Sequence, residues 1–299
     1  MNYKYIKYKK KYLELKGRNK INIIITYNLS WATQKNDSKS KSSEQEFVKK
    51  CQQSKLINID WEYTRRQDLF PSWCTQIAFD GIINFIKEKK TSLDIIGFQE
   101  CIKELFNEKN NIILNYLKNN LKENFKIINH SNINKDKPFT SIIYNNNTLK
   151  FIKSFDSHFK NEEGRPFMIS LFENNFNKNK LIVINCHMPH TNTNDNLKEL
   201  YETYIKNINI KIDRIIILGD FNIHNIELDI INNFNSTPKL SNPISKPISC
   251  CWPNFNYIGD LILDSNKQKK LDILDNFKFI LGIKKIYIGS DHHPIYAEY

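Results

Sequence analysis

The chain has 299 residues, of which 40% are hydrophobic and 12% aromatic, so it is long and apolar enough to bury the core of one large domain or two small ones. That composition excludes a wholly disordered chain, and the absence of any apolar run near roughly 20 residues excludes a membrane-spanning segment. The formal charge of +12 favours a polyanionic partner such as nucleic acid or an anionic membrane surface.

The first 17 residues, MNYKYIKYKKKYLELKG, are compositionally unusual. Tyr5, Tyr8, Tyr12 and Leu15 recur at helical spacing among lysines, and a glycine follows as a C-cap, so residues 1–17 are predicted to form a basic amphipathic helix. This helix either binds anionic lipid or a phosphate backbone, or is simply an exposed helix tethered to the domain. It lacks the uninterrupted apolar region of a signal peptide.

The same segment resembles the Tyr- and Lys-rich N-termini of proteins from giant DNA viruses. Lys, Asn and Ile are abundant throughout the chain, as the codons of an AT-rich genome would make them. The resemblance and the composition together imply a viral source. They also make the net charge a weaker indication of a polyanionic partner, because part of the excess of lysine then reflects the codons of an AT-rich genome.

Short apolar runs alternate with helical patterns along the rest of the chain. Residues 73–90 have the periodicity of a helix, and further helical patterns lie near 103–121 and 195–211. A doubly wound sheet needs a helix in nearly every crossover, and the helices here are too few for that, so an α+β fold with largely antiparallel or mixed sheets is predicted. The predicted strands are 21–28, 93–100, 125–130, 140–145, 167–173, 181–187, 214–222, 257–263 and 294–299.

Residues 32–72 form a segment too long to be a mere connection after the first strand. Its part at 35–46 is polar and low in complexity, which predicts mobility, and its position would suit a lid over a cleft. No internal repeat or domain boundary is evident. We therefore expect the helix at 1–17 to precede one domain at 18–299 that carries this insert.

Six cysteines, at positions 51, 74, 101, 186, 250 and 251, show no spacing of a disulfide framework. A reducing compartment follows, so the protein is expected to be intracellular and cytoplasmic, in a viral factory or virion if the source is viral. Cys250 and Cys251 could suggest a metal site, but they lack the C-x-x-C spacing that lets two thiolates converge on one zinc. Buried or loop thiols are expected there.

Polar side chains follow several of the predicted strands, commonly just after a glycine that permits a sharp turn. Taken singly each is weak evidence, since Glu100 could cap the next helix, Asp220 a turn, and His187 could be a satisfied core imidazole. Several buried strands that deliver such groups at their ends nevertheless predict one crowded polar site. Its members would be Asn28, Glu100, His187, Asp220, Asn222, Asp291 and His292.

Six ordered motifs carry a family resemblance: TYN at 26–28, DIIGFQE at 94–100, EGRPF at 163–167, INCHMP at 184–189, LGDFN at 218–222 and SDHHP at 290–294. In this combination the chain resembles the endonuclease/exonuclease/phosphatase superfamily, which includes DNase I-like nucleases, apurinic-site endonucleases, sphingomyelinases and inositol-polyphosphate phosphatases. The resemblance spans 21–299. It implies a four-layer α/β/β/α sandwich whose last strand holds the SDHHP motif in the active site.

The resemblance also implies metal-dependent phosphodiester chemistry. A phosphodiester repels nucleophiles and has a poor leaving group, so its hydrolysis needs a cation, a base and a group that neutralises the departing oxygen. Glu100 matches the family's metal ligand, with Asn28 and Asp291 on the metal side. Carboxylate and amide oxygens suit Mg²⁺ or Mn²⁺.

Five further side chains match catalytic or phosphate-binding positions of the family, and Asp260, described below, is a sixth. Asp220 orients or deprotonates the attacking water, Asn222 hydrogen-bonds the phosphate, and His292 contacts the scissile phosphate or serves as the base; which of Asp220 and His292 takes the proton stays open. His187 matches a group near the leaving oxygen. Arg165 matches a phosphate-contacting arginine, for which a guanidinium is suited.

Asp260 matches the carboxylate that orients the terminal histidine. This assignment departs from the family pattern at the preceding residue, because Gly259 stands where related sequences often carry an apolar side chain. A turn carboxylate is therefore the alternative for Asp260.

The motif set predicts a Mg²⁺-dependent phosphodiesterase, a nuclease acting on DNA or RNA in the first place. A phosphatase or phosphodiesterase acting on a lipid or inositol phosphate headgroup is the alternative, because the long insert has no counterpart in small nucleases. A catalytically silent nucleic-acid-binding member is a third possibility, disfavoured because the polar residues of the motifs are all present. Nucleic acid is the expected partner, an anionic membrane a second one through the N-terminal helix, and the protein is expected to be a monomer.

Overall fold

The fold is taken from a computed structural model. It describes residues 21–35, 45–49, 69–70, 72–107, 111–131, 137–160, 164–191, 193–206, 208–223, 236, 238–241, 243–251, 257–274, 278–281, 284–287, 290 and 292–299. The predicted helix at 1–17 and most of the segment 32–72 lie outside this set.

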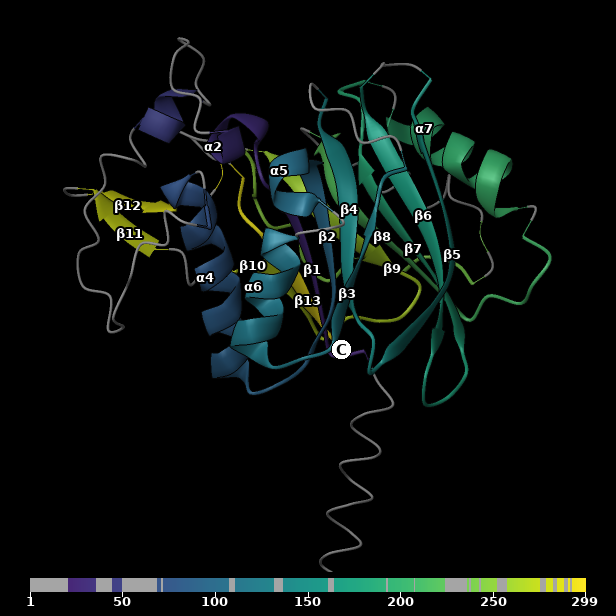
Figure 1. The fold of residues 1–299 in the computed structure, drawn as a ribbon. Coiled ribbons are helices and arrows are strands. Elements are labelled where there is room, and N and C mark those ends of the chain that lie inside the picture. Colours follow the sequence, from purple (N-terminus) through teal and green to yellow (C-terminus); the bar gives the residue numbers. More distant parts are fainter. Residues whose placement is uncertain are drawn as a thin grey trace, which may run out of the picture.

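Six strands form one mixed sheet in the order β10-β13-β1-β2-β4-β3 (Figure 1). β1 and β2 run parallel, whereas the other neighbours are antiparallel. The last strand of the chain thus pairs with the first, in agreement with the expectation for the C-terminal run. The strands are β1 (Ile23–Asn28), β2 (Leu93–Cys101), β3 (Phe125–Asn129), β4 (Phe139–Asn145), β10 (Lys270–Ile273) and β13 (Ile295–Glu298).

Five strands form a second sheet in the order β5-β6-β7-β8-β9, in which only β7 and β8 are parallel. They are β5 (Leu149–His158), β6 (Pro166–Asn174), β7 (Lys180–His187), β8 (Arg214–Ile223) and β9 (Ile258–Asp264). A separate hairpin joins β11 (Lys278–Leu281) to β12 (Lys284–Tyr287).

Helices cover the outer faces of the two sheets (Figure 1). α4 (Trp73–Lys89) and α6 (Ile112–Leu121) pack on the first sheet, while α7 (Thr193–Glu199) and the π-helical η1 (Leu200–Ile205) pack on the second. The short α2 (Trp31–Lys35) and α5 (Lys103–Phe106) follow β1 and β2. The layers are therefore α/β/β/α, as predicted. In the part of the chain that the structure describes, no helix has the length and apolar character to cross a membrane.

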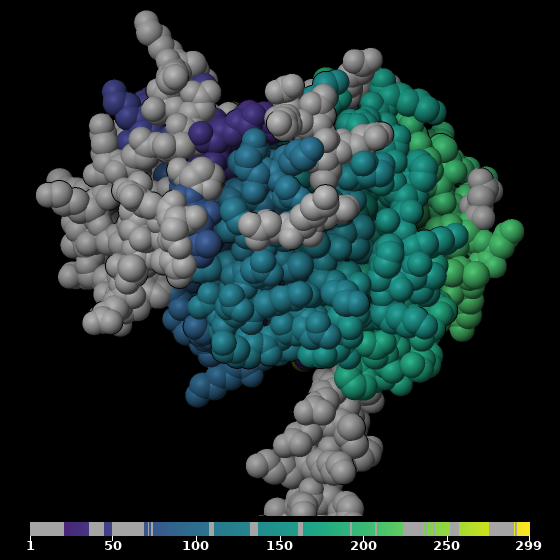
Figure 2. All heavy atoms as spheres, in the orientation of Figure 1, coloured from purple at the N-terminus to yellow at the C-terminus, as the bar shows by residue number. Residues whose placement is uncertain are grey.

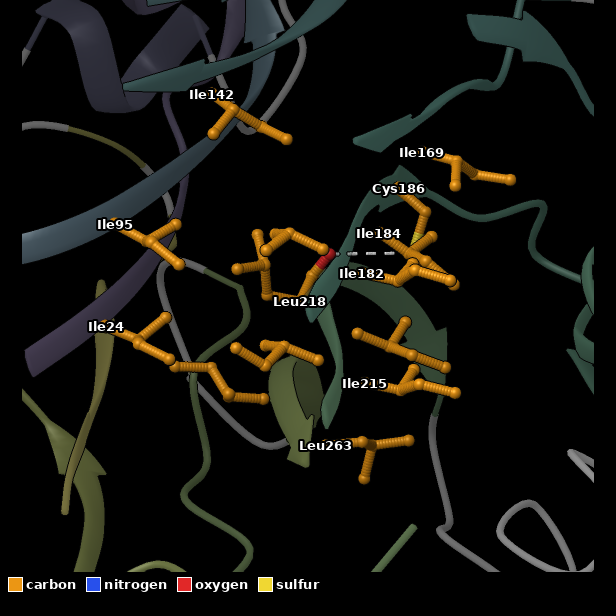
Figure 3. Packing of buried hydrophobic residues seen from close by; sticks show 14 of the residues in the cluster. Ile24, Ile95, Ile142, Ile169, Ile182, Ile184, Cys186, Ile215, Leu218 and Leu263 are labelled. Carbon is orange, nitrogen blue, oxygen red and sulfur yellow. Dashed lines mark hydrogen bonds between the residues drawn. The ribbon is translucent and has the colours of Figure 1, made fainter. Parts of the chain in front are cut away.

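Alternation along the strands divides the core into two clusters. Ile23, Ile25 and Tyr27 of β1 face the helices α4 and α6, whereas Ile24 faces the second sheet. Figure 3 shows Ile24, Ile95 and Ile142 on one side of Leu218, with Ile182, Ile184 and Ile215 on the other. In the orientation of Figure 2, much of the visible face is made of blue to teal atoms, which belong to α4, α6 and the strands that follow α6.

Gly97 lets the two sheets approach each other. A Cβ atom at this position would lie 1.8 Å from Cδ1 of Leu218, a distance at which something must shift. Because Leu218 belongs to β8 and Gly97 to β2, the missing side chain sets the spacing of the sheets close to the polar strand ends.

The predicted helices and strands differ from the structure in several places. The pattern at 103–121 contains two helices with the non-helical Asn107 between them, and the pattern at 195–211 ends as a helix at Ile205. β5 was not predicted, because most of its side chains are at least partly exposed and it carries lysines among its apolar residues. β10 was missed because it is only four residues long and opens on an exposed lysine.

Candidate active site

The predicted polar residues meet at one edge of the sandwich. Asn28 ends β1 and Glu100 lies near the end of the parallel neighbour β2, while His187 ends β7 and is in register with Asp220 of the parallel strand β8. Carboxyl ends of parallel strands lie at the same edge of a sheet, and both parallel pairs point the same way here. The edge is the one from which α2 emerges in Figure 1.

Asn28 connects the carboxylates of the two sheets. Its Nδ2 donates to Oε1 of Glu100 at 3.1 Å and to Oδ2 of Asp220 at 2.9 Å. Its Oδ1 accepts from the backbone N–H of Ser30 at 3.0 Å, which fixes which end of the amide faces the carboxylates. Asn28 is fully buried, so this bridge is held in a low-dielectric environment.

Glu100 is held by the segment that follows β1. Its Oε2 accepts from the backbone N–H of Trp31 at 2.8 Å, and its backbone carbonyl accepts from Nε2 of Gln34 at 2.7 Å. Its side chain is 20% exposed. The alternative that Glu100 caps the next helix is wrong, because that helix, α5, has Ile102 as its N-cap residue and no side-chain cap.

His187 lies between the same two carboxylates and Arg165. Its Nε2 is 3.7 Å from Oε1 of Glu100 and 3.6 Å from Oδ2 of Asp220, and the guanidinium of Arg165 contacts both His187 and His190. Burial lowers the pKa of His187 to about 3 despite the attraction of Asp220. The imidazole is therefore neutral at neutral pH.

Asp220 is oriented by backbone and amide groups. Its Oδ1 accepts from the backbone N–H of Asn222 at 2.9 Å, and Nδ2 of Asn222 donates to the carbonyl of Met188 at 2.7 Å. Burial opposes the charge of Asp220, but the imidazole of His292 and the hydrogen bonds from the N–H of Asn222 and Nδ2 of Asn28 outweigh it and lower its pKa below the ordinary value. Asp220 is thus ionised.

His292 and Asp260 form a buried pair on the other side of Asp220. Nδ1 of His292 is 2.8 Å from Oδ2 of Asp260, and Nε2 of His292 is 3.8 Å from Oδ2 of Asp220. Burial raises the pKa of Asp260 to about 6 although His292 opposes it. The alternative of a turn carboxylate is wrong, because Asp260 lies within β9 opposite Asp220. Asp291 lies outside the described residues.

The donor set suits a hard divalent cation. The carboxylates of Glu100 and Asp220 both accept hydrogen bonds from Nδ2 of Asn28, and the uncharged imidazole of His187 lies beside them. Two buried or half-buried negative charges so close together call for a cation, and carboxylate oxygens are the ligands that Mg²⁺ and Mn²⁺ prefer. In this arrangement Asn28 presents its nitrogen to the carboxylates, so the residues that would hold the ion are Glu100 and Asp220.

A polar layer beneath the site escaped the sequence analysis. Gln99 donates from Nε2 to Oδ1 of Asn185 at 2.6 Å and to Oγ1 of Thr26 at 3.1 Å, and Asn185 donates to the carbonyls of Phe98 and Ser141. All of these polar side chains are buried between the sheets. The sequence offered one signal for this layer, namely polar residues at strand positions that face the protein interior, next to the ends of the motifs.

The position of two cysteine sulfur atoms next to His292 was also not predicted from the sequence. Sγ of Cys250 lies 3.5 Å and Sγ of Cys251 3.8 Å from Nε2 of His292, and the two cysteines are joined as a disulfide. Thiols were predicted at these two positions, whereas the structure pairs them as a disulfide. No spacing in the sequence points from 250–251 to His292.

Comparisons with known proteins bear on the fold. No protein-family model matches the chain, and no curated protein does. Among solved structures, an endonuclease/exonuclease/phosphatase family protein from Bacteroides thetaiotaomicron is 16% identical with a TM-score of 0.58, covering 93% of this chain and 96% of its own. A mannosyl-6-phosphatase of the same organism is 16% identical with a TM-score of 0.59, covering 93% and 98%.

A third similar structure is that of D. rerio TDP2 complexed with a single-strand DNA product. It is 14% identical, with a TM-score of 0.53, and the match covers 92% of this chain and 97% of that one. These similarities extend over nearly the whole of each chain and match the two packed mixed sheets flanked by helices. The chain therefore has the DNase I-like fold of endonuclease/exonuclease/phosphatase family proteins.

Proposed function

We propose that the protein is a divalent-metal-dependent phosphoesterase. The observation that carries the proposal is the amide of Asn28, which joins the carboxylates of Glu100 and Asp220 across the two sheets. A neutral His187 and the His292–Asp260 pair flank this centre. Acid, base and cation-binding groups thus converge on one point, which is what the hydrolysis of a phosphoester needs.

Each group has a role that follows from its contacts. Mg²⁺ or Mn²⁺, when bound at Glu100 and Asp220, would polarise the phosphoryl oxygens. Asp220 is ionised and fixed by Asn222, so it orients the attacking water. His292 has its Nδ1 on Asp260 and, in its protonated form, donates from Nε2 to the developing charge on phosphorus-bound oxygen.

Arg165 and His187 complete the site on the opposite side of Asp220. The Arg165 guanidinium contacts His187 and suits a phosphate oxygen, while the neutral imidazole of His187 serves the departing oxygen. Asn222 donates to Met188 in this state and would bind the phosphate after a rotation of its side chain. Asp291 is proposed as a further ligand on the metal side from its place in the SDHHP motif.

A nucleic acid is the proposed substrate. The formal charge of +12 favours a polyanion, and the TDP2 neighbour was solved with a single-strand DNA product. The second candidate is a phosphomonoester of a small molecule or lipid headgroup, which the mannosyl-6-phosphatase neighbour favours. The catalytically silent alternative is disfavoured by the intact set of Glu100, Asp220, Asp260 and His292 around one point.

A release assay tests the proposal and separates the substrates. The full chain would be incubated with Mg²⁺ or Mn²⁺ and plasmid DNA, abasic duplex, single-stranded RNA, sphingomyelin, inositol phosphates and a sugar phosphate. Products would be resolved by gel electrophoresis and phosphate release. We expect cleavage of nucleic acid. If the folded protein hydrolyses none of these with either metal, the proposed function is wrong.

A further inference from the structure

The cysteine pair beside the catalytic imidazole has no role in phosphoester chemistry. Cys250 forms isolated bridges with Tyr257 and with His292, so its backbone is held between the strand β9 region and the segment that carries His292. The sulfur atoms lie next to Nε2 of His292, the nitrogen that faces Asp220. We propose that, once reduced, Cys250, Cys251 and His292 bind a thiophilic divalent cation, Zn²⁺.

The two sulfur-to-nitrogen distances fit a tetrahedral zinc. With Zn–S near 2.3 Å and Zn–N near 2.1 Å, a tetrahedral angle places sulfur and nitrogen about 3.6 Å apart. The observed Sγ to Nε2 distances are 3.5 Å for Cys250 and 3.8 Å for Cys251. Two thiolates, one imidazole and one open position form a ligand set that zinc takes in proteins. The C-x-x-C spacing that usually supplies two thiolates is absent, but in the structure the two Sγ atoms and Nε2 of His292 all lie within 4.8 Å of one another, so these adjacent cysteines do reach one point.

Asp260 prepares the imidazole for a metal. Its Oδ2 accepts from Nδ1 of His292 at 2.8 Å, so in the neutral ring the lone pair lies on Nε2, on the side of the sulfur atoms. A carboxylate on the second nitrogen is the usual partner of a zinc-bound histidine, since it fixes the ring and increases its basicity. The same contact that serves catalysis therefore serves zinc.

Gly259 supplies the space for the sulfur atoms. A Cβ at this position would lie 2.6 Å from Cβ of Cys250, 3.5 Å from its Sγ and 3.4 Å from Cε1 of His292. Gly259 stands where related sequences often carry an apolar side chain. In the structure the missing side chain is what lets Cys250 pack against the catalytic imidazole. Cys251 is half-buried, which gives a cation a route to the pair.

A phosphine reductant and water convert the disulfide into two thiols and the phosphine oxide. Zn²⁺ then displaces the two thiol protons as it forms two Zn–S bonds and one Zn–N bond. Reduction also frees the sulfur atoms to move to the separation of about 3.8 Å that a tetrahedral zinc requires.

Bound zinc would block the phosphoesterase reaction, a consequence that rests on the proposed function. It occupies Nε2 of His292, so this nitrogen is no longer available to the phosphate. The protein would then need Mg²⁺ at Glu100 and Asp220 and be inhibited by Zn²⁺ at Cys250, Cys251 and His292. Zn²⁺ prefers soft thiolate ligands and Mg²⁺ prefers hard carboxylate oxygens, so the two ions are expected to occupy different sites.

Cobalt spectroscopy tests the binding without any activity measurement. The full chain, reduced with a phosphine and freed of it under argon, would be titrated with Co²⁺. We expect thiolate-to-cobalt charge-transfer absorption in the near ultraviolet that saturates at about one Co²⁺ per chain and disappears when Zn²⁺ is added. The oxidised protein should show no such band, because disulfide sulfur is not a thiolate.

Variants locate the site. The double substitution Cys250→Ser, Cys251→Ser should abolish the band, and Asp260→Asn should weaken Co²⁺ affinity by about 10- to 100-fold. Cys101→Ala and Cys186→Ala, which remove the buried free thiols, are the matched controls and should keep it. A band that survives the double substitution, or no band in the reduced parent, would overturn the proposal.

Inhibition is measured separately in saturating Mg²⁺, with each protein compared with its own zinc-free rate. Zn²⁺ should inhibit the parent at concentrations that leave the double serine variant unaffected. Equal inhibition of both would refute the inhibitory role while the cobalt spectra decide the site. A protein with no phosphoesterase activity but a thiolate–cobalt band would refute the proposed function alone.

Discussion

The contact between Asp260 and His292 offers a quantitative test of the site. The two side chains are buried and Nδ1 of His292 is 2.8 Å from Oδ2 of Asp260. A hydrogen bond to a charged group is worth about 1.5 to 3 kcal/mol, which corresponds to about a 10- to 150-fold change in rate. We expect Asp260→Asn to lower kcat/KM by that factor, because the amide keeps the volume of Asp260 and removes its charge.

His292→Ala should lower the rate by about 10² to 10⁴, the range of a positioned acid–base group. If Asp260 acts only through His292, the double variant should be no slower than His292→Ala alone, and the coupling energy should equal the loss caused by Asp260→Asn. Steady-state kinetics of the four proteins on one phosphodiester would give these values. Losses that simply multiply in the double variant would refute the reasoning.

The control for these variants is the neighbouring imidazole. His293 is 2% exposed and its backbone N–H donates to the carbonyl of Ser249 at 2.8 Å, so the side chain is buried next to the site. His293→Gln keeps most of its volume and should retain parental kcat/KM. Thermal melts of all variants would separate unfolding from lost chemistry, and a larger kinetic defect at His293 than at His292 would overturn the site assignment.

Three further predictions follow from the structure. EDTA should abolish activity and Mg²⁺ or Mn²⁺ restore it, and Glu100→Gln should raise the Mg²⁺ concentration needed for half-maximal rate by about 10-fold or more without unfolding; parental metal dependence would exclude Glu100 as a ligand. Burial raises the pKa of Asp94 to about 6, so the free energy of unfolding is largest below the unfolded-state pKa near 4 and falls as pH rises through 6. Relative to Asp94→Asn, the parent should lose up to about 3 kcal/mol between pH 4 and pH 8 in urea melts, and parallel curves would contradict this. Asp264→Asn breaks the buried pair with Arg214 and should cost about 3 to 5 kcal/mol in the same assay with kcat unchanged, whereas a stable variant would show that the pair is dispensable.

Most of the fold was predictable because its strands are continuous apolar runs. A strand buried on both faces, such as β8, cannot be mistaken for a loop, and the parallel pairs bring their polar ends to one edge. β5 could not be predicted, because a partly exposed edge strand has no alternation to detect. Its place in the sheet depends on pairing with β6, which is tertiary information.

The site was predictable as a set of residues but not as a set of contacts. The motifs located Glu100 and Asp220, yet only the structure shows that Asn28 turns its nitrogen toward both. The contact of Cys250 with His292 joins segments that are 42 residues apart, and it forms because Gly259 between them has no side chain. Sequence patterns record strand periodicity, whereas these contacts depend on how the ends of separate strands pack.

Backbone conformation links the stability of this edge to its chemistry. Ser30, Glu100 and Asn222 have φ values of 54°, 56° and 51°, in the left-handed region that non-glycine residues rarely adopt. Such conformations cost on the order of 1 kcal/mol or more each and persist only where surrounding contacts enforce them. At Glu100 these contacts are the N–H of Trp31 on the carboxylate and Gln34 on the carbonyl, and at Asn222 they are Asp220 and Met188. The hydrogen bonds that offset the strain are thus those that aim the two carboxylates, so a substitution that relaxes the backbone here also releases the groups that we propose as metal ligands.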